Sequence, residues 1–304
     1  MLAGPSHRAP ATDRDRLTLT ARRQCNRVDT LPVTSSPWSA EWRRSAPRSL
    51  ARATKSTRAN RLTRTLGVLA TLLALTGCEH PVDPLVRPTT IEATYRLLYN
   101  DSLVGSSLFV LSIDAAGGYR LDAFTTPAGK MQREQAHEVL ETSLGEIDAT
   151  SVRPALFEES VMHDGDMQIA RVRFDWAERA LTVDGPEGSR RVALLPGTQD
   201  RLSYLLAASR LAAAGAGTHL LQVASAAASE ENRLEIEGHE PVTLPLGHFD
   251  AVRISRLTPD EQETRTLWFS PDMGPLPLRA LQLRDGNSVE MRLEDFTRRP
   301  SDPR

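Results

Sequence analysis

The chain has 304 residues, of which 40% are hydrophobic, 5% aromatic and 25% charged, which is enough apolar material for a globular core. Its formal net charge of −2 is unevenly distributed, because the first 78 residues hold fourteen Lys and Arg against four Asp and Glu while the remainder is acidic. Two cysteines, Cys25 and Cys78, exclude a disulfide framework and a thiolate zinc site.

Residues 1–60 are rich in Arg, Ser, Thr, Ala and Pro and show no sustained apolar period, so they predict a disordered basic arm. One interpretation is an arm that binds nucleic acid or anionic lipid. The other is that translation starts further downstream. No methionine lies between Met1 and Met131, so a non-ATG start near Leu50 or Leu62 would escape notice. We favour the second interpretation.

Residues 61–77 have the features of a secretory signal. Arg61 and Arg64 precede an apolar run of about ten residues at 66–75, whereas a bilayer-spanning helix needs about 20. The run ends in Leu-Thr-Gly-Cys78, which resembles the bacterial lipobox. This resemblance implies that Cys78 is diacylated and that the chain before it is removed. The alternative is a buried helix that ends in Gly-Cys.

A lipidated Cys78 would anchor the mature chain to a membrane, because several acyl chains together hold a protein stably. Residues 78–90 contain three prolines and predict an extended tether. Glu79 stands where inner-membrane lipoproteins of enteric bacteria typically carry Asp. We therefore expect a protein of the bacterial cell envelope that faces the periplasm, at the outer membrane rather than the inner one.

The segment 91–297 is predicted to form a single β-rich domain, because its hydrophobic residues mostly recur with period two. Turn sequences at Asn100-Asp-Ser and Asp285-Gly-Asn separate alternating segments, as in hairpins. Strands are expected at 91–99, 103–113, 119–126, 131–143, from 154, 167–176, 180–184, 190–195, 218–224, 233–237, 249–257, 264–269, 276–283 and 288–294.

One helix is expected within this domain, over residues 200–214. Thr198 is the predicted N-cap, Asp200 stands in the first turn where an anion is favoured, and Gly215 ends the helix. The fold class is therefore mainly β: a curled antiparallel sheet or partly closed barrel of about 11–12 strands, with one main helix packed against it. Residues 298–304 are expected to be a disordered tail.

Three stretches of this domain together resemble domain-of-unknown-function family 3108, a bacterial exported family. They are Leu195-Pro-Gly-Thr-Gln-Asp-Arg-Leu-Ser203, Gly238-His-Glu with Leu244-Pro-Leu-Gly-His-Phe249, and Leu267-Trp-Phe-Ser-Pro271 through Leu276-Pro-Leu. The resemblance covers about residues 91–297. It implies an exported domain whose curved sheet around a helix looks like the periplasmic lipoprotein-carrier fold, and it implies no chemistry.

Metal sites are not predicted. His239, Glu240 and His248 could meet across one hairpin as a zinc-like set, but solvated hairpin residues explain them as well. The run His163-Asp-Gly-Asp166 is typical of a turn and lacks calcium-loop spacing. No cofactor is expected either.

Catalysis is not expected, since the chain has no G-x-S-x-G elbow. Ser203 follows Asp200 by three residues, on one helix face, with no histidine nearby in sequence. We interpret Asp200 as an anchor of the helix and Ser203 as a surface or packing residue.

Aromatic side chains are the remaining candidates for a site. Trp268, Tyr204, Trp176 and Phe109 are candidates to bind a ligand on a concave apolar surface, although packing in the core is the favoured explanation of such aromatic residues. Further candidates for such a lining are Tyr95, Phe124 and Phe174.

Three functional hypotheses follow. The first is a lipid-anchored periplasmic protein that binds or carries an apolar or amphipathic ligand. The second is an envelope assembly or adaptor protein that binds protein partners through an edge strand or exposed face. The third, a hydrolase, is the weakest. No nucleic-acid partner is expected, and the oligomeric state stays open.

Overall fold

The computed structural model describes residues 88–133, 137–163, 166–186, 188–225, 229–257 and 263–300. The predictions for Cys78, its leader and residues 1–60 lie outside these ranges. The described strands are β1 (Thr89–Tyr99), β2 (Ser102–Ile113), β3 (Gly118–Pro127), β4 (Val139–Ile147), β5 (Val152–His163), β6 (Asp166–Asp175), β7 (Ala180–Gly185), β8 (Gly188–Ala193), β9 (Gly217–Ala224), β10 (Ser229–Leu244), β11 (Gly247–Leu257), β12 (Glu263–Phe269), β13 (Arg279–Arg284) and β14 (Asn287–Pro300). The helices are α1 (Gly129–Arg133), α2 (Ser203–Ala214) and the 3-10 helix η1 (Pro271–Met273).

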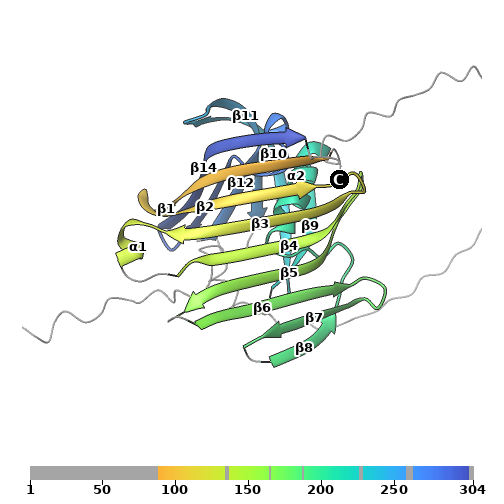
Figure 1. The fold of residues 1–304 in the computed structure, drawn as a ribbon. Helices are drawn as coiled ribbons and strands as arrows, with labels where there is room; N and C mark the ends of the chain where they lie inside the picture. Colours follow the sequence, from red (N-terminus) through yellow and green to blue (C-terminus); the bar gives the residue numbers. More distant parts are fainter. Residues whose placement is uncertain are drawn as a thin grey trace, which may run out of the picture. The chain divides into compact units, whose positions relative to one another are not determined.

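All fourteen strands belong to one antiparallel sheet, in the order β8-β7-β6-β5-β4-β3-β2-β1-β14-β13-β12-β11-β10-β9 (Figure 1). The chain runs outward from β1 to β8, passes through α2, and returns from β9 to β14. Strand β14 then pairs along the whole of β1, from Thr89 opposite Pro300 to Tyr99 opposite Val289. This pairing joins the first and last strands of the domain and places β8 and β9 at the two edges of the sheet.

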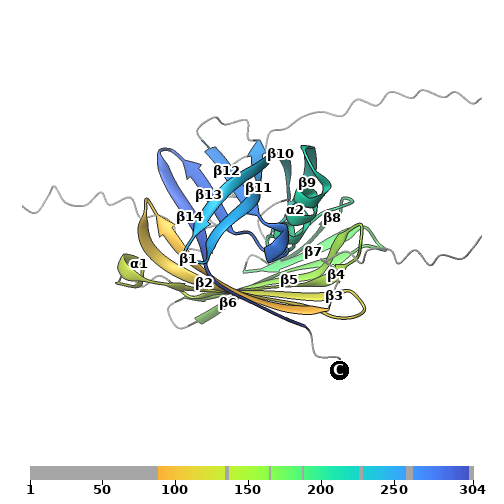
Figure 2. The same ribbon diagram turned by 90° about the horizontal axis from the view of Figure 1, so that it is seen from above.

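The sheet curls so that α2 lies between its two halves (Figure 2). The helix contacts β5 in one half and β9 and β11 in the other. Just before the helix, Gln199 makes a parallel bridge to Val223 of β9, with its backbone bonded to Gln222 and Ala224. Its side-chain amide donates to the carbonyl of Val152 in β5 at 2.9 Å. Gln199 therefore connects an edge of the sheet to the opposite half.

Period-two alternation and tight turns explain why these residues form this sheet. Along β1, for example, Ile91, Ala93, Tyr95 and Leu97 are buried while the intervening side chains are more exposed. The turn after β1 places Asn100 and Asp101 at φ values of 46° and 62°, as a two-residue hairpin of type I′ requires. The buried face of the sheet and one face of α2 form one continuous hydrophobic core.

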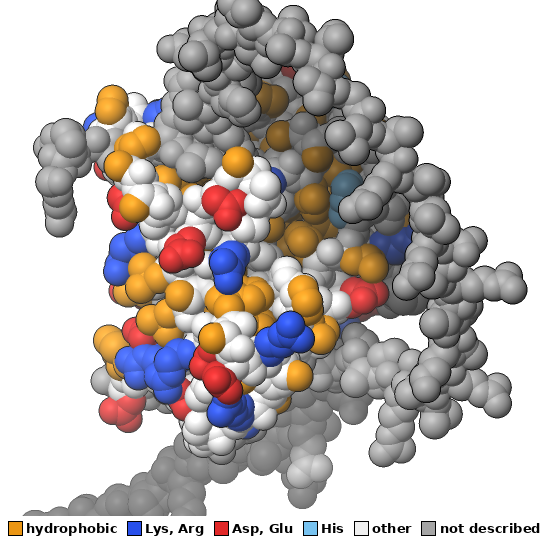
Figure 3. All heavy atoms as spheres, turned by 90° about the vertical axis from the view of Figure 1, so that its right-hand side faces the viewer, with side chains coloured by type: hydrophobic (Ala, Val, Ile, Leu, Met, Phe, Trp, Pro, Cys, Tyr) orange, Lys and Arg blue, Asp and Glu red, His pale blue; other side chains and the backbone are white. Residues whose placement is uncertain are grey.

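The outer face of the sheet is mixed, with charged side chains beside exposed hydrophobic ones such as Leu108, Phe124 and Leu140. Cross-strand ion pairs lie on it, such as Arg171 with Glu158 at 2.5 Å and Arg279 with Glu290 at 2.6 Å. On the face shown in Figure 3, acidic and basic side chains are interspersed with hydrophobic ones over its described part. This pattern is typical of an antiparallel sheet that is packed on one side and solvated on the other.

The predicted fold class is confirmed, with several differences in detail. The sheet has fourteen described strands rather than 11–12, and its edge strands β8 and β9 are not paired with each other in the described residues. Residues 131–143 are not one strand, because α1 ends at Arg133 and β4 begins at Val139. Strand β14 continues to Pro300, so residues 298–300, expected in a tail, pair with β1.

The helix also begins later than predicted, at Ser203, and the predicted N-cap is wrong. The hydroxyl of Thr198 donates to the carbonyl of Leu195 at 2.7 Å and does not reach the helix. The Asp200 carboxylate takes that role instead, since its Oδ1 accepts from the backbone N–H groups of Leu202 and Ser203, both at 2.8 Å.

Candidate functional site

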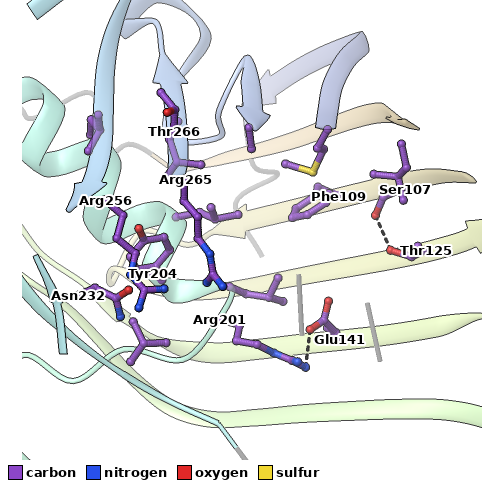
Figure 4. A pocket seen from close by; sticks show the side chains of 18 residues that line it. Ser107, Phe109, Thr125, Glu141, Arg201, Tyr204, Asn232, Arg256, Arg265 and Thr266 are labelled. Atoms are coloured by element: carbon purple, nitrogen blue, oxygen red, sulfur yellow. Dashed lines mark hydrogen bonds and ion pairs between the residues drawn. The ribbon is translucent and has the colours of Figure 1, made fainter. Parts of the chain in front are cut away.

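A cavity lies inside the curled sheet, between its two halves and the start of α2 (Figure 4). About 940 Å³ of it is free of protein atoms, counted out to its open mouth, and the centre of a water-sized molecule can move through about 100 Å³. The cavity is therefore narrow. Its lining residues are Leu97, Ser107, Phe109, Thr125, Glu141, Arg201, Leu202, Tyr204, Leu205, Val223, Asn232, Ile254, Arg256, Arg265, Thr266, Leu267, Ala280 and Met291.

Much of this lining is apolar. Phe109 of β2 contacts the Tyr95 ring edge-on, with centroids 5.1 Å apart, and Leu267 of β12 lies opposite Ala280 of β13. The Tyr95 hydroxyl donates to the carbonyl of Pro277 at 2.8 Å, which satisfies it away from the cavity. An apolar chain could therefore lie against these side chains without leaving their polar groups unpaired.

A buried charged triad, Glu141, Arg201 and Glu159, lies at one wall of the cavity, and Glu141 and Arg201 line it. Arg201 follows Asp200 directly, and its Nη2 lies 2.7 Å from Glu141 and 2.8 Å from Glu159. Its guanidinium also lies 5.1 Å from the centre of the Phe157 ring. The triad holds two carboxyl groups against one cation. The pKa of Glu141 is raised to about 7 by burial, with Arg201 opposing the rise and repulsion from Glu159 and Asp200 adding to it.

A chain of hydroxyl groups fixes Asp200 beside this triad. Ser143 of β4 donates to Asp200 Oδ2 at 2.7 Å, so the Tyr119 hydroxyl, 3.0 Å from Ser143, must donate to Ser143. The Ser203 hydroxyl accepts from the backbone N–H of Asp200. Burial raises the pKa of Asp200, against the hydrogen bonds from Ser203, Ser143 and Leu202. These hydrogen bonds anchor the start of the helix at Asp200, and Ser203 is fully buried rather than on the surface.

A second polar group of residues lies on β10, β11 and β12. Arg256 and Arg265, which we call the arginine pair, are directly opposite each other on neighbouring strands. Arg256 pairs with Glu230 at 3.5 Å and Arg265 with Glu263 at 2.7 Å. Figure 4 shows both arginine side chains directed toward the cavity, together with Tyr204. Burial raises the pKa of Tyr204 to about 12, against the two arginines.

The four aromatic residues predicted to bind a ligand are in three places. Phe109 and Tyr204 line the cavity. Trp268 lies on the other face of β12, in an open hollow, under the guanidinium of Arg279 at 4.7 Å. Trp176 follows β6, donates to the carbonyl of Pro154 at 2.8 Å and stacks on Phe174 at 6.1 Å. The structure therefore brings two of the four together.

Two of the histidines considered as metal ligands, His239 and His248, are exposed on the β10–β11 hairpin. His239 pairs with Asp250 at 2.8 Å, and His248 contacts the Thr243 hydroxyl at 3.0 Å. Over the described ranges, no three His, Cys, Asp or Glu side chains come together in a way that could hold a metal ion. Nor does any helix in those ranges combine the length and apolar character needed to span a bilayer.

Sequence reasoning missed the polar lining of the cavity. Glu141 shares the inward phase of β4 with Val139 and Ser143, and Asn232 shares that of β10 with Leu234. A polar residue in the buried phase of an alternating strand is the signal that could have revealed both.

The fold and cavity define a curled-sheet domain with an interior site, and the comparisons place it in a family. The family model described as "Protein of unknown function (DUF3108)" matches residues 94–294. The chain therefore belongs to the DUF3108 family. No curated protein matches the sequence.

Two solved structures are similar. One is a β-barrel-like protein of the domain of unknown function DUF1849 from Brucella abortus, with 13% identity and a TM-score of 0.50, covering 70% of this chain and 99% of that chain. It supports the fold alone. The other is a candidate lipoprotein from Parabacteroides distasonis, with 11% identity and a TM-score of 0.25, covering 70% of this chain and 97% of that chain. A TM-score this low carries no argument.

Proposed function

We propose that this protein is a lipid-anchored protein of the bacterial envelope that binds an amphipathic ligand inside its curled sheet, and that it is not an enzyme. The observation that carries the proposal is the cavity between the halves of the sheet. Its lining combines apolar side chains such as Phe109 and Leu267 with polar and charged ones such as Asn232 and Arg256. Ligand sites commonly have this composition, since apolar walls supply affinity and a few polar groups fix orientation.

The anchor is proposed from the sequence before the domain. Cations, a short apolar run and small residues precede Cys78, which is the order that a lipoprotein signal requires. Cys78→Ala should abolish incorporation of radiolabelled palmitate and leave the domain folded, because no described strand includes that residue. Equal labelling of wild type and variant, or a mature N-terminus mapped far from Cys78, would defeat the proposed anchor.

Ligand binding is tested by filling the cavity. Ala280 lines it and is 1% exposed, so Ala280→Leu adds three carbon atoms to the space a ligand would occupy. Ala193→Leu, on the exposed edge strand β8, is the matched control. We expect Ala280→Leu to weaken the affinity for an apolar dye at least about tenfold. Ala193→Leu should leave this affinity unchanged.

Native mass spectrometry of the gently purified full chain supplies the second measurement. The proposal expects co-purified mass on the wild type and a loss of that mass with Ala280→Leu. A mass equal to the protein alone, together with no binding of an apolar dye, would refute a ligand-binding role.

One observation favours the adaptor alternative. Strand β8 is an edge of the sheet, and all six of its residues are exposed, so its backbone could pair with a strand of another protein. A photo-crosslinking residue at Ser189 tests this in cells. A stoichiometric protein partner without any bound lipid would favour the adaptor role over ligand binding.

A further inference from the structure

The side chain of Asn232 is the most informative polar group of the cavity. It lies on the inward phase of β10, is 1% exposed, and lines the cavity. Its Nδ2 donates to the carbonyl of Glu230 at 3.5 Å, which assigns the remaining carbonyl oxygen, Oδ1, as the free end. Oδ1 is buried and has no hydrogen-bond partner in the protein.

A buried acceptor without a donor is uncommon, because burial removes its hydrogen bonds to water and no protein donor replaces them, which costs free energy. Figure 4 shows Asn232 beside the cavity, with Tyr204 and Arg256 in the same part of it. A ligand that carries an O–H or N–H group would supply the missing donor. The position of Oδ1 therefore indicates the chemistry of the polar end of the ligand, which we call its head.

The charges around this position restrict the head further. The arginine pair is matched by two carboxylates, Glu230 and Glu263, at 3.5 Å and 2.7 Å. All four groups lie on three neighbouring strands, and their formal charges sum to zero. An anionic head would therefore find no surplus positive charge, and it would also face the lone pairs of Asn232 Oδ1.

A cationic head fits no better. An ammonium group could donate to Asn232, but the arginine pair already engages Glu230 and Glu263, so no surplus negative charge is left to offset the desolvation of a cation. A neutral head avoids both costs, and the Tyr204 hydroxyl, which lines the same cavity, can donate to it or accept from it.

We propose that the ligand is a single-chain amphiphile whose head is neutral and carries a hydrogen-bond donor, such as an alcohol or a primary amide, and that Asn232 Oδ1 accepts from this donor. The inference rests on the proposed ligand-binding function. The single chain follows from the small volume of the cavity, about 100 Å³.

The test uses the full-length protein with a fluorescent apolar dye and three competitors that share one alkyl chain: decanol, decanoate and decylammonium. We expect decanol to displace the dye at a concentration at least about tenfold lower than either charged competitor requires. This factor corresponds to one buried hydrogen bond that decanol forms and the charged competitors do not. Asn232→Leu, which is close in volume and lacks the acceptor, should remove this preference, so that decanol no longer displaces the dye at a lower concentration than the charged competitors.

The outcomes separate the two proposals. Dye binding with tighter displacement by decanoate or decylammonium would overturn the neutral head and leave the ligand-binding function standing. Failure of the dye and all three competitors to bind would overturn both. Equal weakening of all three competitors by Asn232→Leu would show that Asn232 only shapes the cavity. The comparison of competitors on the wild type needs no variant, so the inference stays testable if Asn232→Leu fails to fold.

Discussion

Glu141 should make the protein less stable as the pH rises toward neutrality, and Glu141→Gln should remove this effect. The side chain is 5% exposed and shares Arg201 with Glu159, so two carboxyl groups compete for one cation. The neutral amide of Gln imitates the protonated carboxyl. Arg201 stays paired in the variant, because Glu159 remains 2.8 Å away.

The magnitude follows from the pKa of Glu141, which burial raises from 4.5 to about 7 in the folded protein. Between these values the unfolded chain has lost its proton while the folded protein still holds it, so unfolding becomes more favourable as the pH rises. This difference between the two pKa values corresponds to about 3 kcal/mol of folding stability. The stability is lost between about pH 4.5 and 7, and the loss stays constant above that range. Below pH 4.5 both states are protonated and the cost vanishes.

Urea denaturation followed by tryptophan fluorescence, at pH values from 5 to 8.5, measures this directly. Glu141→Gln should match the wild type closely at pH 5 and exceed its free energy of unfolding by about 3 kcal/mol at pH 8. Glu290→Gln is the matched control, and it should lower the free energy of unfolding at pH 8 instead of raising it. Arg292 and Arg279 lower the pKa of Glu290 against the effect of its burial, so its charged form stabilises the fold at pH 8. Parallel pH curves for wild type and Glu141→Gln, or a less stable variant at pH 8, would refute the reasoning.

Three further predictions concern stability, each measured as a free energy of unfolding. Arg201→Met leaves two buried carboxyl groups without their cation and should cost about 3–5 kcal/mol at pH 8, with partial recovery at pH 5; an equal loss at both pH values would contradict this. Gly145→Ala places a Cβ 2.3 Å from a backbone oxygen and should cost about 1–3 kcal/mol, whereas Gly185→Ala, with nothing within 4 Å, should change stability by less than about 1 kcal/mol. Gln199→Ala removes the hydrogen bond to the carbonyl of Val152 and should cost about 1–3 kcal/mol; no change would mean that this bond does not hold the curl.

Local patterns were sufficient to predict most of the strands. The turns at Asn100-Asp101 and Asp285-Gly286 need positive φ values, which residues of these types adopt readily, so the hairpins on either side could be located from sequence. The boundary at residue 139 could not, because the segment before it contains no Pro or Gly to mark the end of a helix. Pairing of β1 with β14 is also invisible to local reasoning, since it joins residues about 200 positions apart.

The site was harder to predict than the fold. Aromatic residues are natural candidates for an apolar lining, yet Trp268 lies on the outer face of β12 and Trp176 lies away from the cavity. The residues that distinguish the cavity are a Glu, an Asn and arginines, which are unremarkable by type. They become informative only when the curl turns their strands toward each other. Arg256 and Arg265, for example, meet because of the register between β11 and β12.

The segment before α2 is a specific sequence motif whose side chains hold the curl of the sheet together. Three consecutive residues bind three different parts of the sheet: Gln199 bonds to β9 and β5, Asp200 to Ser143 of β4, and Arg201 to carboxylates of β4 and β5. Each contact requires a particular side chain at a particular position, so the segment is constrained by the closure of the curl. The same closure leaves the cavity between this segment and β10–β12, where the ligand head is proposed to bind. Changes at Gln199 should therefore loosen the whole domain, whereas changes at Asn232 should alter which ligand it prefers.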